Sequence, residues 1–248
     1  MASKDDLQFT SKESKLPIID TEWYSAQVEL WPREGKHIIA QYDDNSIIVY
    51  QAYNSSIAEY AVENQSNGGK LQYWTYELQF GGPNFSFDRM SWIKTNFLWM
   101  MYRCGWASKE NQERVLAVRI TRAGFEEILA NAFTAKLQKS EGLEKDKIMV
   151  RLQWDPDHSP TYEKLPRRAI QLGLKGEILK KYGTEWVVSI ADISDFVKEQ
   201  KRILDEKGPE EIRTPKERVY TLADPSISAR IGLDSTEKHE EPSFVGFS

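Results

Sequence analysis

The amino-acid sequence predicts an α+β protein: a single domain with a mixed, largely antiparallel sheet flanked by helices. Two observations predict this class. Several segments rich in β-branched and aromatic residues are bounded by turn residues, as strands usually are. Stretches with apolar residues at helical spacing lie between these segments, and some neighbouring strands are close enough in the chain to form hairpins.

The expected domain covers residues 21–208. The residues before it, 1–20, are polar and charged and are predicted to form a flexible N-terminal arm. Beyond Pro209 the composition shifts to charged and turn-forming residues, so residues 209–248 are expected to form an extended C-terminal tail.

The first third of the chain is expected to hold a hairpin and a helix. The residues Asp43-Asp44-Asn45 form a turn signal between two strand-like segments. Ser56 and Glu59 have the spacing of a capping box, which predicts a helix to about Gln65. Residues 22–31 have no clear period and receive no assignment. The expected strands here are 37–42, 46–53 and 71–80.

The most apolar part of the chain runs from Phe85 to Trp106. Alternation predicts a strand at 89–94, and Thr95 is placed to cap a following helix that ends at Gly105. Four apolar side chains recur at helical spacing along one side of this helix, and further apolar residues occupy the other side, so we expect it to be buried. The four are Phe97, Met100, Met101 and Cys104.

The second half is expected to continue the sheet. Helices are predicted around Phe125 to Phe133, at 177–182, and from Ser194 to Gly208. The charged residues 136–146 are expected to be a loop, and Trp154 to Asp157 a turn. The expected strands are 114–121, 147–154, 168–174 and 186–191.

Composition excludes several classes of function. No apolar run reaches about 18 residues, so we expect no membrane span. One cysteine in 248 residues fits a reducing compartment, and the cytoplasm or nucleus is expected. The net charge is −5, which argues against an extended surface for duplex DNA, because that mode of binding needs many phosphate contacts.

Common catalytic motifs are absent from the sequence. The histidines His37, His158 and His239 are isolated, and none has a metal-ligand spacing. There is no glycine-rich phosphate loop of the Gly-x-x-x-x-Gly-Lys type and no Gly-x-Ser-x-Gly motif. We therefore predict no particular catalytic residue.

Three cations lie within the most apolar stretch: Arg89, Lys94 and Arg103. Cations are rarely fully buried without a partner. They either reach the surface and pair with carboxylates, or they line a pocket in which a guanidinium group binds phosphate and Trp92 stacks on a base. Both alternatives remain open at this point.

Glutamines interrupt three predicted strands, and each has an aromatic residue or an arginine nearby. If Gln51 and Gln171 converge with the cations, they form one polar cleft at the edge of the sheet, to which Gln153 also belongs. A strand glutamine more often simply faces solvent. The candidate ligand-binding residues are Gln51, Tyr53, Arg89, Trp92, Lys94, Arg103, Trp154, Arg168 and Gln171.

Several segments together resemble a family known as domain of unknown function 4291. They are YDDNSIIVYQAY, RMSWIKTNFLWMMYRCGWA, QERVLAVRITRAGF, VRLQWDP and RRAIQLGL. This resemblance implies a soluble domain and no established activity. The order of strands is also similar, at the level of the fold, to ADP-ribosyltransferase-type folds that bind NAD, in which Gln51 and Gln171 are the positions to test.

We therefore expect a domain that binds a nucleotide or an RNA end. If this domain is an enzyme, we expect a divergent NAD-dependent ADP-ribosyltransferase-like enzyme, with NAD as the ligand. The alternative is a non-catalytic protein-interaction module whose aromatic centre is only core.

Overall fold

The computed structural model describes residues 9–10, 17–64, 80 and 82–235. The strand expected at 71–80 lies outside the described residues except for Phe80, which is a buried turn residue. Most of the expected arm, 1–20, and the end of the expected tail, 236–248, also lie outside them.

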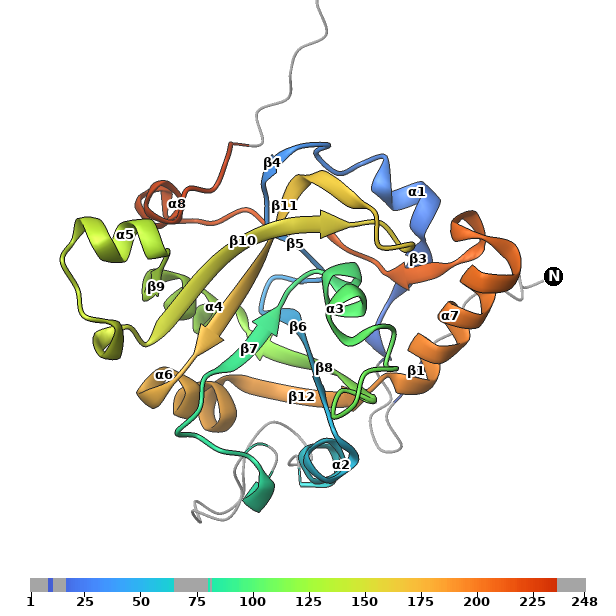
Figure 1. Ribbon diagram of the computed structural model, residues 1–248, viewed down its shortest axis with the longest axis horizontal. Helices are drawn as coiled ribbons and strands as arrows, with labels where there is room; N and C mark the ends of the chain where they lie inside the picture. Colours follow the sequence, from blue (N-terminus) through green and yellow to red (C-terminus); the bar gives the residue numbers. More distant parts are fainter. Residues whose placement is uncertain (1–8, 11–16, 65–79, 81, 236–248) are drawn as a thin grey trace, which may run out of the picture.

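A mixed sheet organises the described part of the chain (Figure 1). Its strand order is β12-β8-β6-β7-β11-β10-β9, and β4 pairs with β11 beside this path. The pairs β9–β10 and β4–β11 are parallel, and the other neighbours are antiparallel, which confirms the predicted class. The strands are β4 (Gly35–Lys36), β6 (Ser46–Tyr53), β7 (Ser91–Lys94), β8 (Arg114–Thr121), β9 (Ala132–Phe133), β10 (Val150–His158), β11 (Lys164–Leu174) and β12 (Val187–Asp192).

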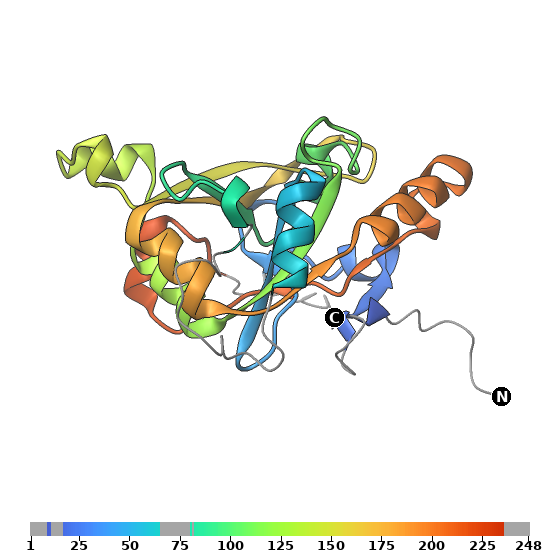
Figure 2. The same ribbon diagram turned by 90° about the horizontal axis from the view of Figure 1, so that it is seen from below.

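Helices cover both faces of this sheet, and each face has its own core. On one face α4, α6 and α8 contribute buried side chains; on the other, α3 and α7 do. Figure 2 shows α5 and α7 projecting at opposite ends of the molecule. The helices are α1 (Tyr24–Val28), α2 (Ser55–Glu63), α3 (Phe97–Cys104), α4 (Arg122–Ala130), α5 (Ala135–Ser140), α6 (Gly176–Lys181), α7 (Ser194–Lys207) and α8 (Pro225–Ile231).

Strand β6 shows how the two cores are separated. Successive side chains of a strand point to opposite faces. Ile47 and Val49 accordingly belong to the core with α4, whereas Ile48 and Tyr50 belong to the core with α3. Because both faces are covered, β6 is apolar nearly throughout, and a polar side chain within it needs a specific partner.

Helix α3 matches its prediction closely. Its N-cap is Asn96, one residue after the expected Thr95, and the Asn96 side chain accepts a hydrogen bond from Trp99 N at 2.8 Å. Gly105 ends the helix in the left-handed region, at φ 61°, as expected. The predicted apolar stripe is buried, Phe97 and Cys104 included.

The part of the expected C-terminal tail that the structure describes differs from the prediction. Residues 213–231 form β13 (Arg213–Pro215), β14 (Arg218–Val219) and α8, and they pack into the domain. β13 pairs with β3 (Thr21–Trp23), and β14 pairs with β5 (Ile39–Ala40). Tyr220 and Ile231 are buried in the core. The strands that pair with β13 and β14 are distant in sequence, so the charged local composition of residues 209–231 did not indicate this packing.

Three shorter predictions also differ. Residues 136–146 contain α5 and a 3₁₀ turn rather than only a loop. β10 continues through the expected turn at Trp154–Asp157 to His158, because β11 pairs with it along this length. The helix predicted to reach Phe133 ends at Ala130, and the last residues of the pattern form β9 instead.

Candidate functional site

The central sheet opens between β6 and β7. One register pair, Tyr50 with Lys94, joins these strands. Beyond it β6 stays paired with β8 as far as Tyr53, and β7 stays paired with β11 over its whole length. A cavity of about 680 Å³ lies where the two strands separate, and both strands line it.

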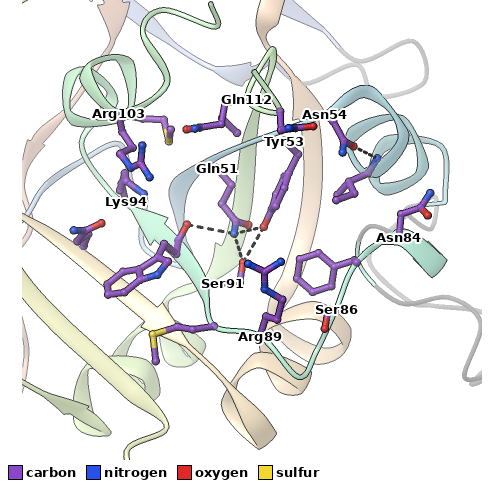
Figure 3. Close-up of a pocket in the computed structure, with 18 residues that line it drawn as sticks. Gln51, Tyr53, Asn54, Asn84, Ser86, Arg89, Ser91, Lys94, Arg103 and Gln112 are labelled. Carbon is purple, nitrogen blue, oxygen red and sulfur yellow. Dashed lines mark hydrogen bonds between the residues drawn. The ribbon is translucent and has the colours of Figure 1, made fainter. Parts of the chain in front are cut away.

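Side chains from several elements converge on this cavity (Figure 3). β6 supplies Gln51 and Tyr53, and β7 supplies Ser91, Trp92 and Lys94. The remaining cations and the second glutamine come from other parts of the chain: Arg89 from the segment before β7, Arg103 from α3, and Gln171 from β11.

A cluster of hydrogen bonds spans the gap between the strands. Gln51 Nε2 donates to Tyr53 OH at 2.7 Å and to Ser91 Oγ at 2.9 Å, and it lies 3.4 Å from the main-chain oxygen of Trp92. On its other side Gln51 Oε1 accepts from Tyr182 OH at 2.7 Å. Gln51 is 2% exposed, so these bonds satisfy a polar group in the middle of the sheet.

These bonds leave one hydroxyl hydrogen without an assigned acceptor. The Trp92 carbonyl can only accept, which orients the Gln51 amide with Nε2 towards β7. Tyr53 OH and Ser91 Oγ both accept from Gln51 and lie 2.8 Å from each other, so one donates to the other. The hydrogen of the second hydroxyl is then available to an acceptor in the cavity.

The ring of Tyr53 is held by aromatic neighbours. Its centroid lies 6.0 Å from those of Phe80 and Phe85, in edge-on geometry. Burial raises the pKa of Tyr53 well above its ordinary value, so the phenol is neutral at physiological pH. Tyr53 therefore serves as a hydrogen-bonding group rather than as an anion.

Lys94 is the buried cation of the site. It is 4% exposed, and within the described part of the chain its ammonium group forms no hydrogen bond or ion pair. Burial, with a smaller effect of the neighbouring charge of Arg103, lowers the pKa of Lys94 to about 8. Both causes disfavour the charged form, and an anion in the cavity would reverse this.

Arg89 and Arg103 are exposed at the cavity, and neither guanidinium group has a partner among the described residues. No aspartate or glutamate is among the described residues that line the cavity. The carboxylate of Asp155 has a small opposing effect on the pKa of Lys94, and it accepts a hydrogen bond from Gln171 Nε2 at 2.6 Å. The wall of the cavity therefore carries an excess of positive charge.

Trp92 offers a half-buried indole at the same cavity. It lies directly opposite Gly173 on β11. A Cβ atom at Gly173 would lie 2.5 Å from Met90 Sδ and 3.0 Å from Trp92 Cη2, so a side chain there would collide with both residues. The absence of a side chain at Gly173 thus sets the position of the indole.

The chain belongs to the family described as Domain of unknown function (DUF4291). The family profile matches residues 37–220, which include every residue that lines the cavity. The match also extends past residue 208, in agreement with the packing of β13 and β14 into the domain. A comparison with curated proteins found no match.

Two of the predicted site residues lie away from the cavity. Trp154 packs against the core with α4 and α8, on the face opposite to Lys94 and Gln171, and its indole Nε1 donates to the main-chain oxygen of Ile231 at 2.9 Å. Arg168 is exposed on β11, three residues before Gln171 and opposite Pro156. Since strand residues rise about 3.3 Å each and alternate faces, Arg168 neither reaches the cavity nor points to it.

The other seven predicted residues line the cavity together. The sequence interpretation missed Ser91 and four amide side chains that lie outside the predicted strands and helices, because single polar residues there carry no pattern. Gln153 is exposed and reaches the site only through a 2.8 Å bond from Gln171. The missed amides are Asn54, Asn84, Asn111 and Gln112.

The loop after α3 places two of those amides. Trp106, Ala107 and Asn111 all have φ between 54° and 65°, which is the left-handed region that side chains disfavour. The loop is held by bonds back to the helix, such as Trp106 N to Met101 O at 3.0 Å. The Trp106 indole also donates to Pro160 O at 3.3 Å.

No helix among the described residues is long and apolar enough to cross a membrane. No group of three or more histidine, cysteine, aspartate or glutamate side chains in the described ranges is placed to hold a metal ion.

Proposed function

We propose that the cavity between β6 and β7 binds a nucleotide or the phosphorylated end of an RNA. The observation that carries this proposal is the charge of the lining: Arg89, Lys94 and Arg103 face the cavity, and none of the described lining residues is a carboxylate. Cations that lack counter-ions favour an anionic ligand, and guanidinium groups match phosphate geometry.

The remaining groups suit the rest of a nucleotide. The indole of Trp92 supports stacking of a base, the side chain of Gln171 suits hydroxyl groups, and Gln51 orients the hydroxyls of Tyr53 and Ser91. The hydroxyl hydrogen available from Tyr53 or Ser91 provides a donor. A cavity of about 680 Å³ lies within the range of 300–1,000 Å³ that is typical of small-molecule sites.

NAD is included in this proposal as a dinucleotide with two phosphates. If the domain is an enzyme, the proposed activity is ADP-ribosyltransferase-like. No carboxylate among the described residues lines the cavity to act as a base, so the site would act by positioning and by charge stabilisation. A non-catalytic interaction module remains the competing proposal, and it predicts no binding of any of these ligands.

The test is a thermal-shift panel with NAD, ADP-ribose, ATP, GTP and a short 5′-phosphorylated RNA. A ligand at about a hundred times its dissociation constant stabilises the folded state by about 2.7 kcal/mol. For a chain of this size the melting temperature should rise by about 5–10 °C. A shift with NAD or ADP-ribose alone directs the next assay to nicotinamide release.

Variants locate the binding. Arg89→Ala and Arg103→Ala remove exposed side chains without partners, so the fold should persist while the shift shrinks. Arg168→Ala is the matched control, because Arg168 is equally exposed but lies away from the cavity. Equal shifts for all three variants, or no shift with any ligand, would contradict the proposed site and favour the interaction module.

A further inference from the structure

The burial of Lys94 distinguishes it from a lysine that only binds phosphate. Arg89 and Arg103 already present permanent charges at the accessible part of the cavity, whereas Lys94 is almost fully buried where the strands separate. Other lysines of the chain illustrate the contrast. Lys181 pairs with Glu127 at 2.7 Å and remains on the surface. Lys94 is 4% exposed, and no carboxylate pairs with its ammonium group within the described part of the chain.

The environment of Lys94 therefore favours the neutral amine. Its pKa is lowered to about 8, first by burial and then by the charge of Arg103. About a tenth of the side chains would then be neutral at pH 7, against less than about a thousandth for an ordinary lysine. A neutral amine is a nucleophile, and a desolvated lysine beside another cation is a known arrangement for attack on carbonyl groups.

No other side chain that lines the cavity is as well suited to this role. Arginine stays protonated, so Arg89 and Arg103 cannot act as nucleophiles. The hydroxyls of Tyr53 and Ser91 are engaged with the Gln51 amide, and no histidine or carboxylate among the described lining residues could remove their protons. Lys94 is also the only amine among the described lining residues.

We propose that Lys94 forms an imine with the carbonyl carbon of a small phosphorylated aldehyde or ketone held in the cavity. This inference uses the same anion-binding side chains as the proposed function and rests on it for the phosphate. The two arginines bind the phosphate group, and the side chain of Gln171 and the hydroxyl pair of Tyr53 and Ser91 face the hydroxyl groups of the ligand.

The step balances without another reactant. The lone pair of Lys94 Nζ attacks the carbonyl carbon, and a carbon–nitrogen bond forms to give a carbinolamine. The carbonyl oxygen then leaves as water together with the two hydrogens of the amine, and the carbon–nitrogen double bond remains. No oxidation or reduction takes place, and hydrolysis returns the free amine.

The test uses pyridoxal 5′-phosphate as the probe, with the full chain. Borohydride reduces any imine to a stable secondary amine, and peptide mass spectrometry then identifies the modified lysine. We expect modification mainly at Lys94, with a rate that rises with pH and levels off above about pH 8. Pyridoxal, which has no phosphate, should react at least about tenfold more slowly, and glyceraldehyde 3-phosphate should protect Lys94.

Matched variants separate the site from general lysine reactivity. Lys94→Arg keeps the charge and should abolish the modification, and Lys94→Met provides a second variant if the first does not fold. Lys109→Arg replaces an exposed lysine in the loop after α3, and it should leave the Lys94 modification unchanged. Arg89→Ala should slow the reaction with pyridoxal 5′-phosphate to that with pyridoxal, whereas Arg168→Ala should not.

Each outcome decides between the proposals. If folded protein carries the modification on surface lysines and not on Lys94, the imine proposal is wrong. If nucleotides still raise the melting temperature in that case, the anion site stands alone. If Lys94 reacts equally with both probes and no phosphate ligand shifts the melting temperature, the amine is reactive but the phosphate site, and with it the phosphorylated substrate class, is wrong.

Discussion

Tyr50 and Lys94 face each other at the register pair that joins β6 to β7, and the sheet opens directly beyond them. The pair therefore holds Lys94 at the closed end of the opening, while the strand ends diverge around the cavity. Tyr50 is fully buried against Phe97 of α3, with ring centroids 5.7 Å apart, so the closed end is also packed against a helix.

The first prediction concerns the hydrogen bonds across the gap. Gln51→Leu should reduce the free energy of unfolding by about 2–4 kcal/mol, because the buried hydroxyl of Tyr182 loses its acceptor. Gln153→Leu is the control on an exposed glutamine and should change it by less than about 0.5 kcal/mol. Urea denaturation measures both; equal effects would mean that the Gln51 bonds contribute nothing.

The second prediction is a pH dependence. The pKa of Lys94 is lower in the folded chain, about 8, than in the unfolded chain, about 10.4. Between these values the unfolded state binds more protons, so this residue makes stability rise with pH. The free energy of unfolding of Lys94→Met, minus that of the wild type, should therefore fall by about 2 kcal/mol between pH 7.5 and 9.5.

Only the difference in the free energy of unfolding between Lys94→Met and the wild type isolates the contribution of Lys94 to the pH dependence. Burial raises the pKa of the Cys104 thiol, so ionisation of this group in the unfolded chain opposes the Lys94 effect in the same range. Denaturant titrations at matched pH values provide the comparison. An advantage of Lys94→Met that stays constant with pH would show that the pKa of Lys94 is not lowered.

The third prediction concerns Gly173. Gly173→Ala should push Met90 and Trp92 towards the cavity, because the added methyl group overlaps both. We expect a stability loss of about 1–3 kcal/mol and a loss of affinity for a cavity ligand of about tenfold. Tryptophan fluorescence should report the movement. Unchanged fluorescence and affinity would place the indole outside the ligand site.

The fourth prediction concerns Glu217, whose buried carboxyl group lies against the first turn of α3. It accepts from Phe97 N at 2.8 Å and from Asn96 Nδ2 at 3.2 Å. Glu217→Ala should cost about 2–4 kcal/mol, because two buried donors lose their acceptor. Glu217→Gln keeps an acceptor without an ionisable group.

The pH dependence of Glu217→Gln has a defined sign. Burial raises the pKa of Glu217 well above its usual value, so the folded chain retains a proton that the unfolded chain has lost. Wild-type stability is therefore lost as pH rises from about 4.3 through the folded pKa, and Glu217→Gln should not show this loss. Denaturation curves at pH 5 and pH 7 test it; identical pH dependence of the two proteins would contradict it.

The sequence predicted the central features of the cavity because they break local patterns. Gln51 stands in an otherwise apolar strand, and Lys94 stands in the most apolar stretch of the chain; polar groups in such places need a reason. Trp154 failed as a site residue because a one-residue step along a strand reverses the face, and aromatic character alone does not say which face is the core.

The strand order and the opening of the sheet could not be predicted. They depend on pairs such as Gln171 with Lys94, which are far apart in sequence. The same limitation concealed the packing of residues 213–231, whose contacts with residues 21–23 and 39–40 join opposite ends of the chain. Local composition carries no information about such pairs.

The position of Glu217 has a consequence for how this protein is made. During synthesis α3 leaves the ribosome long before the carboxylate that caps its first turn, and β3 and β5 leave long before β13 and β14. The hydrogen bond from Phe97 N and the pairing of β3 and β5 with β13 and β14 therefore cannot form in the nascent chain until residues 213–219 have been translated. Folding of this domain should thus be completed only after residues 213–219 have left the ribosome, and nascent chains stalled before residue 217 should be sensitive to proteases and dependent on chaperones.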